Sequence, residues 1–192
     1  MSIIVDGTGK GTRAAVDSDN RLKVNAIVED VYVNAAEEGD AFNMNTLELT
    51  LTGTGPYTQN LLYVKNNENS DIEVVGWFIG EAGNRSGGNT TSPILFEMYG
   101  SPTGTPGGTE VPVINRRIGD PRVFDFSCVA KPTNVTIPSG QAPLLYQYHY
   151  GGRAFGTVNF TIPSGASILL RANIECNDVS LYTGFTGYVR GE

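Results

Sequence analysis

Positive charge is scarce in this 192-residue chain. Thirteen lysines and arginines stand against twenty aspartates and glutamates, so the formal net charge is −7. Because a phosphate backbone is held mainly by clustered Lys and Arg, this balance argues against binding to nucleic acid or to an anionic membrane. The sequence has no run of about 18 apolar residues, and no positively charged segment followed by an apolar one near its start. It therefore predicts no membrane span and no secretory signal.

Cysteine and histidine are also rare. Cys128 and Cys176 are the two cysteines, and their spacing is that of neither a zinc site nor a redox dithiol. We expect two buried free thiols rather than a disulfide, because nothing directs the chain to an oxidising compartment. His149 is the sole histidine, so it makes no His-rich metal site, and no Gly-x-Ser-x-Gly elbow accompanies it. A surface or half-buried strand position is the expectation for His149.

Motifs for cofactors and catalysis are missing as well. Residues 7–12 look like a phosphate loop, but Gly11 stands where Ser or Thr should follow the lysine, and Ile4 where the first glycine should be. Asp17, Asp19 and Asn20 resemble the start of a calcium loop without its downstream glutamate. The sequence therefore predicts no cofactor, no metal and no catalytic residue. A carboxylate pair assembled from distant strands is an alternative that sequence leaves open.

Helix-forming sequence is nearly absent, and alternation of apolar and polar residues dominates. The one helix candidate covers residues 35–42, with Asn34 as the cap and Gly39 as the end. Strand-like alternation occurs in residues 47–52, 72–79, 94–99, 158–162 and 168–174. Short strands separated by frequent turn signals are typical of a β-sandwich or barrel. We expect an all-β antiparallel sandwich, jelly-roll-like, over residues 35–192, with Trp77 in its core.

Glycine and proline mark the turns of this sandwich. The sequence Asn-x-Thr-Ile-Pro-Ser-Gly occurs at residues 134–140 and again at 159–165, and a Leu-Leu pair follows each copy at the same spacing. Proline sets φ and glycine supplies the positive φ of a tight turn, so the repeat predicts two equivalent corners of one sandwich. The glycine-rich stretches 80–93 and 100–108 predict exposed loops, which carry binding surfaces in many folds.

The first 34 residues differ from the rest. They contain a short apolar segment, a glycine-rich spacer and a predicted hairpin of residues 12–18 with 21–28, and their apolar residues are too sparse to form a core. Such a segment must bury its strands against the main domain or against another chain. We predict an N-terminal attachment arm over residues 1–34. Its assembly contacts are Ile3, Ile4, Val5, Val16, Leu22, Val24 and Ile27.

A tyrosine-rich strand is the candidate binding surface. Tyr146, Tyr148 and Tyr150 alternate, so all three project from one face of the strand. We favour the interpretation that this face lines the sandwich core, with the hydroxyls at its edge. The alternative is an exposed surface that stacks on sugar rings or packs against a partner.

Five segments within about the first 70 residues carry a family resemblance: residues 4–11, 15–24, 42–46, 49–52 and 62–68. In these segments the chain resembles small virion structural proteins of tailed bacteriophages. The Ile-Pro-Ser-Gly corners are similar to turns of viral jelly rolls. The resemblance implies a sandwich on an attachment arm, assembled as a symmetric oligomer, here expected to be a homotrimer. It also implies a location on a virion capsid or tail, after synthesis in the host cytoplasm.

Three functions remain at this stage. The first is a non-enzymatic capsid decoration or cement protein, whose arm strands add to the edges of neighbouring subunits of itself, of the major capsid protein or of another virion protein. The second is a tail, fibre or baseplate adhesin that binds a host surface glycan through Tyr146, Tyr148, Tyr150 and the glycine-rich loops. The third, an enzyme acting on surface polysaccharide, has no motif to support it.

Overall fold

The computed structural model describes residues 15–16, 22–23, 31–83 and 85–190. The chain divides into two compact units, residues 1–30 and 31–192. In the first unit, β1 (Ala15–Val16) and β2 (Leu22–Lys23) pair antiparallel, with Val16 opposite Leu22. The remaining predicted arm contacts lie outside the described residues; they are Ile3, Ile4, Val5, Val24 and Ile27.

The second unit begins with its one described helix, α1 (Val31–Glu38). The predicted start at residue 35 is wrong, and Asn34 lies inside the helix rather than at its cap. Valine has a low helix propensity, but propensity is a weak preference that the context of the chain overrides. The predicted end is confirmed: Gly39 adopts φ +86° and the Asp40 amide donates to the Ala35 carbonyl. No described helix is long and apolar enough to cross a membrane.

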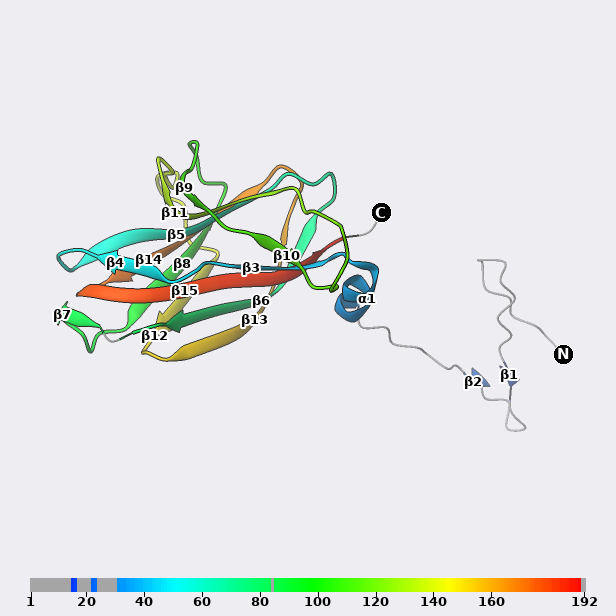
Figure 1. The fold of residues 1–192 in the computed structure, drawn as a ribbon, viewed down its shortest axis with the longest axis horizontal. Coiled ribbons are helices and arrows are strands. Elements are labelled where there is room, and N and C mark those ends of the chain that lie inside the picture. The colour runs from blue at the N-terminus through cyan, green and yellow to red at the C-terminus, as the bar shows by residue number, and fades with distance from the viewer. Residues whose placement is uncertain (1–14, 17–21, 24–30, 84, 191–192) are drawn as a thin grey trace. The chain divides into compact units, whose positions relative to one another are not determined.

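Two antiparallel sheets pack face to face in the second unit, which confirms the predicted all-β sandwich (Figure 1). The first sheet has the strand order β10 (Val113–Asn115), β3 (Ala41–Asn45), β15 (Cys176–Val189), β6 (Ile72–Glu81), β13 (Arg153–Ile162). The short strands β4 (Leu49–Thr52) and β7 (Ser86–Gly88) also pair with β15. The second sheet has the order β12 (Leu145–His149), β8 (Ile94–Gly100), β14 (Ser167–Ile174), β5 (Tyr57–Asn66), β11 (Phe126–Thr133), β9 (Gly107–Glu110).

Alternation along the strands builds the core between the sheets. In β8, Ile94, Phe96 and Met98 are buried, as the pattern predicted. The same alternation buries every second residue of β14 and places Trp77 of β6 in the core. The two cysteines are free and buried, as expected, and burial raises the pKa of the Cys128 thiol to about 12. The apolar interior therefore holds both thiols in their neutral form at physiological pH.

Two local predictions need correction. The alternation over residues 47–52 puts Leu47 on the same face as Leu49 and Leu51, but its side chain is 81% exposed because β4 begins only at Leu49. The stretch 80–93 is not wholly a loop, since its start completes β6 and β7 pairs with β15. The stretch 100–108 likewise runs into β9. These strands are polar and glycine-rich, so they lack the apolar alternation that predicts a strand. Backbone hydrogen bonds rather than apolar side chains hold them to the sheet.

The repeated Pro-Ser-Gly sequence forms the same turn twice. Gly140 and Gly165 both have φ +77°. In each copy the residue after the glycine donates its amide hydrogen to the proline carbonyl, at 3.2 Å for Gln141 and 2.9 Å for Ala166. The surroundings differ: the second copy joins β13 directly to β14, whereas four residues separate the first turn from β12. The turn is therefore equivalent in the two copies, while the flanking strands are not.

Candidate functional site

One side of the sandwich is open between its two edge strands. Among the described strands, β12 pairs only with β8 and β13 only with β6, so each leaves one edge without a partner. A short turn at residues 150–152 joins these two strands across the sheets. Figure 1 shows β12 and β13 together at one edge of the sandwich. Unpaired edges present backbone donors and acceptors to other chains.

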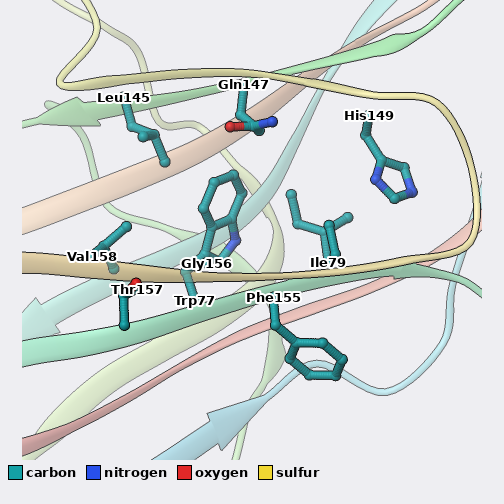
Figure 2. A pocket seen from close by; sticks show the side chains of 10 residues that line it. Trp77, Ile79, Leu145, Gln147, His149, Phe155, Gly156, Thr157 and Val158 are labelled. Atoms are coloured by element: carbon teal, nitrogen blue, oxygen red, sulfur yellow. The ribbon is translucent and has the colours of Figure 1, made fainter.

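A cavity of about 170 Å³ lies between these strands. Figure 2 shows Leu145, Gln147 and His149 reaching from β12 toward β13, with Trp77 of β6 below them and Phe155 pointing away. A second hollow of about 190 Å³ continues along the same strands, and Leu145 and Val158 line both. The open side is therefore a largely apolar depression with free backbone on each flank.

A buried ion cluster closes one end of this side. The Arg85 guanidinium donates to both carboxylate oxygens of Glu81, at 3.1 and 2.5 Å. It also donates to the Ser92 carbonyl and, at 3.5 Å, to the His149 carbonyl. The Arg85 and Glu81 side chains are only 8% and 10% exposed. Arg85 thus holds the end of β6, the following loop and the end of β12 together.

His149 is buried beside this cluster, so the expected surface or half-buried position is wrong. Its side chain is 4% exposed, because residue 149 falls on the inward face of β12 with Leu145 and Gln147. Nε2 lies 3.5 Å from Oε1 of Glu81 and makes no hydrogen bond to any described residue. Burial, with Arg85 nearby, lowers the pKa of His149 below 6.5, and Glu81 offsets only part of this effect.

The buried histidine predicts acid-sensitive stability. In the unfolded chain His149 takes up a proton at a higher pH than in the folded chain, so acid favours unfolding. We expect the free energy of unfolding to fall as pH drops below about 7, by at most about 1.4 kcal/mol per pH unit. Urea titrations between about pH 7.5 and 5.5 measure this slope. His149→Gln should flatten it, and an unchanged slope in that variant would contradict the assignment.

The tyrosine face is exposed, which corrects the interpretation that it lines the core. Tyr146, Tyr148 and Tyr150 are 53%, 47% and 78% exposed. The edge strand β12 turns its odd-numbered residues inward and its even-numbered residues outward. The Tyr146 and Tyr148 rings meet edge to face at 5.5 Å, and their hydroxyls are 3.3 Å apart.

A fixed polar network lies on the same outer face, on β8 and β14. Arg171 donates through Nε and Nη2 to Glu97 Oε2, at 3.2 and 2.8 Å, and Asn173 Nδ2 donates to the same oxygen at 2.8 Å. The Arg171 guanidinium also bonds the Tyr99 hydroxyl at 2.8 Å and lies over that ring. Burial alone raises the pKa of Glu97, but hydrogen bonds from Arg171 and Asn173 outweigh it and leave that pKa below 4.5.

A hollow of about 450 Å³ adjoins this network, where β5 and β8 begin and β14 ends. Its lining residues come from four separate parts of the chain: Pro56, Tyr57, Thr58, Pro93, Leu95, Tyr148, Asn173, Ile174 and Glu175. Of these, only Tyr148 belongs to the candidate binding surface of the sequence analysis, where an exposed position was the alternative to the core. Alternation does place Leu95 with Glu97, and Arg171 with Asn173, on one face of their strands. The sequence could not predict that Glu97 lies opposite both Tyr146 and Arg171, because this pairing depends on strand order.

The described residues contain no group of three or more His, Cys, Asp or Glu arranged to hold a metal ion. In comparisons with known proteins, no family model matches the chain, and no curated protein matches it. The candidate site is therefore defined by geometry alone: the open side between β12 and β13, and the tyrosine face with its network and hollow.

Proposed function

We propose that this chain is a non-enzymatic structural protein of a phage virion, with a jelly-roll sandwich and an N-terminal attachment arm. The observation that carries the proposal is the strand order. Eight strands pair as nested partners, β3 with β15, β5 with β14, β6 with β13, and β8 with β12. Four of them, β3-β15-β6-β13, are consecutive in the seven-stranded sheet, and the other four, β12-β8-β14-β5, are consecutive in the six-stranded sheet. This nesting is the pattern of two Greek keys in a jelly roll, a fold used in viral capsid and lectin domains.

Because a fold alone does not assign a function, surface features must support the role. Nine large apolar side chains are exposed among the described residues, and five of them come from β12, β13 or the residues beside them. These are Leu144, Tyr146, Tyr148, Tyr150 and Phe155. Clustered apolar side chains beside unpaired strand edges suit contact with another protein.

A capsid decoration or cement protein is the form of the proposal that these features favour. Extended segments of neighbouring subunits would add to the free edges of β12 or β13, and their side chains would enter the apolar depression. The partners are copies of this chain, as a homotrimer, and the major capsid protein or another virion protein. Many weak contacts repeated by symmetry would then hold the protein on the virion surface.

Deletion of residues 1–30 tests this proposal. The truncated chain keeps α1 and both sheets, so it should fold with an unchanged circular dichroism spectrum. We expect light scattering to show a trimer for the full chain and a monomer for the truncation. In co-sedimentation, the truncation should lose binding to shells that lack the decoration protein. Unchanged assembly and shell binding by the truncated protein would refute the role of the arm.

The exposed tyrosine face favours a second candidate, a virion adhesin that binds a host surface glycan. Aromatic rings beside a fixed set of hydrogen-bonding groups can stack on sugar rings and orient their hydroxyls. Co-sedimentation with host cells instead of shells separates this candidate from the first. An adhesin should bind intact cells, and removal of surface polysaccharide should abolish that binding.

A further inference from the structure

We propose that the hollow at the ends of β5, β8 and β14 is a saccharide subsite that takes one uncharged pyranose ring. The inference rests on the second proposed function, because it names the ligand class of the tyrosine face. The aromatic part of the lining is Tyr148, whose side chain is 47% exposed. Leu95 and Ile174 supply apolar lining, and polar groups come from Thr58, Asn173 and Glu175. This combination matches a sugar ring, which has apolar C–H faces and a hydroxyl rim.

The polar groups are held in place by one another. Thr58 donates its hydroxyl to Asn173 Oδ1 at 2.7 Å, and Asn173 donates to Glu97 Oε2 at 2.8 Å. Arg171 also pairs with Glu97 through the same oxygen, at 2.8 Å, and so holds this carboxylate in place. A ligand therefore meets side chains whose rotamers are already set, so binding loses little conformational entropy.

This arrangement leaves hydrogen-bonding capacity for a ligand. Among the described contacts, the Asn173 amide uses one of its two hydrogens, and the Thr58 oxygen keeps its lone pairs. The Glu175 carboxylate accepts one bond from Asn89, at 3.2 Å through Oε2, and has Oε1 remaining. One donor and several acceptors side by side suit vicinal sugar hydroxyls, each of which both donates and accepts.

Charge decides the class of sugar. Glu175 is the one charged residue in the lining, and it is exposed. The nearby guanidinium of Arg171 already pairs with Glu97. A uronic or sialic acid would therefore bring its carboxylate toward Glu175 without a cation to receive it. Such repulsion disfavours acidic sugars and leaves uncharged hexoses and N-acetylhexosamines.

Isothermal titration of the full-length protein tests the proposal. The probes are neutral gluco-, galacto- and N-acetylglucosamine oligosaccharides, with an oligouronate as the acidic comparison. We expect at least one neutral probe to bind, and Tyr148→Ala and Asn173→Ala each to raise its Kd about tenfold or more. Tyr148→Phe should keep most of the affinity, because the ring remains. Phe155→Ala is the matched control, since Phe155 is an exposed aromatic residue outside both the hollow and the tyrosine face, and the variant should bind as the wild type does.

The possible results distinguish a failure of this subsite from a failure of the glycan-binding function. If a neutral probe binds equally to wild type, Tyr148→Ala and Asn173→Ala, the hollow is the wrong site while the glycan-binding function stands. If the oligouronate binds more tightly than the neutral probes, the assignment of ligand charge is overturned. If neither the probes nor host cells bind the wild type, the adhesin function fails together with the subsite. Equal melting temperatures of the variants exclude loss of folding as the cause.

Discussion

Replacing Arg85 with methionine should lower the free energy of unfolding by about 3–5 kcal/mol, because the change leaves a buried carboxylate without its partner. The Glu81 side chain is only 10% exposed in the present structure, so its carboxylate would remain largely buried. The neutral His149 would then be its neighbour in the cluster. The loop after β6 would also lose its bond from Arg85 to the Ser92 carbonyl. Equilibrium unfolding in guanidinium chloride, followed by circular dichroism, measures the loss.

Arg190→Met is the matched control for this prediction. Arg190 also pairs with a carboxylate, Glu73, at 2.8 Å, but its side chain is 59% exposed. The Glu73 side chain is 13% exposed, but it keeps the hydrogen bond from the Thr161 hydroxyl at 2.8 Å. A pair whose cation is in solvent contributes about 0–1 kcal/mol, so the loss should be small. Glu81→Gln combined with Arg85→Met should recover part of the stability, since no unpaired charge remains. A loss for Arg85→Met no larger than that for Arg190→Met would show that solvent screens the cluster.

Replacing Phe96 with alanine should cost about 3–5 kcal/mol, the usual range for deleting a buried aromatic ring. Phe96 is fully buried in β8. Its ring meets Trp77 edge to face at 6.3 Å and His149 at 6.0 Å. The deletion therefore opens a void between the sheets next to the cavity on the open side. The melting temperature and the denaturant midpoint of unfolding should both fall.

Phe155→Ala provides the comparison with the same chemistry at an exposed position. The Phe155 side chain is 77% exposed and points away from the cavity (Figure 2). Its loss should change the free energy of unfolding by no more than about 0.5 kcal/mol. Because Trp77 is the sole tryptophan, its fluorescence should shift in Phe96→Ala and stay constant in Phe155→Ala. Similar losses for the two variants would contradict the assigned faces of β8 and β13.

The open side also shows where sequence reasoning failed. A strand with alternating tyrosines was expected to turn them inward, because large aromatic residues are usually buried. In the fold, β12 is an edge strand, and Leu145, Gln147 and His149 line the open cavity on its inward side, with only His149 buried. Alternation predicts that the two faces of a strand differ, but it does not predict which face packs against the other sheet. Here the inward side carries the neutral His149 beside the Glu81 and Arg85 pair, and Gln147, whose amide donates to the Tyr148 carbonyl.

By itself, the sequence determined the class of the fold and much of its local geometry. Period-two alternation determined which residues of β8 and β14 face the core between the sheets, the repeated Pro-Ser-Gly determined two identical turns, and Gly39 determined the end of α1. These features depend on neighbours in the chain, so local physics suffices to predict them.

Only the tertiary structure decided which strands become partners, and with that the candidate sites. Glu97 meets Arg171 across 74 residues, and Arg85 reaches the carbonyl of His149 across 64. The hollow likewise combines residues near 57, 94, 148 and 174. Such contacts follow from strand order, which is set by the joint packing of both sheets rather than by any local segment.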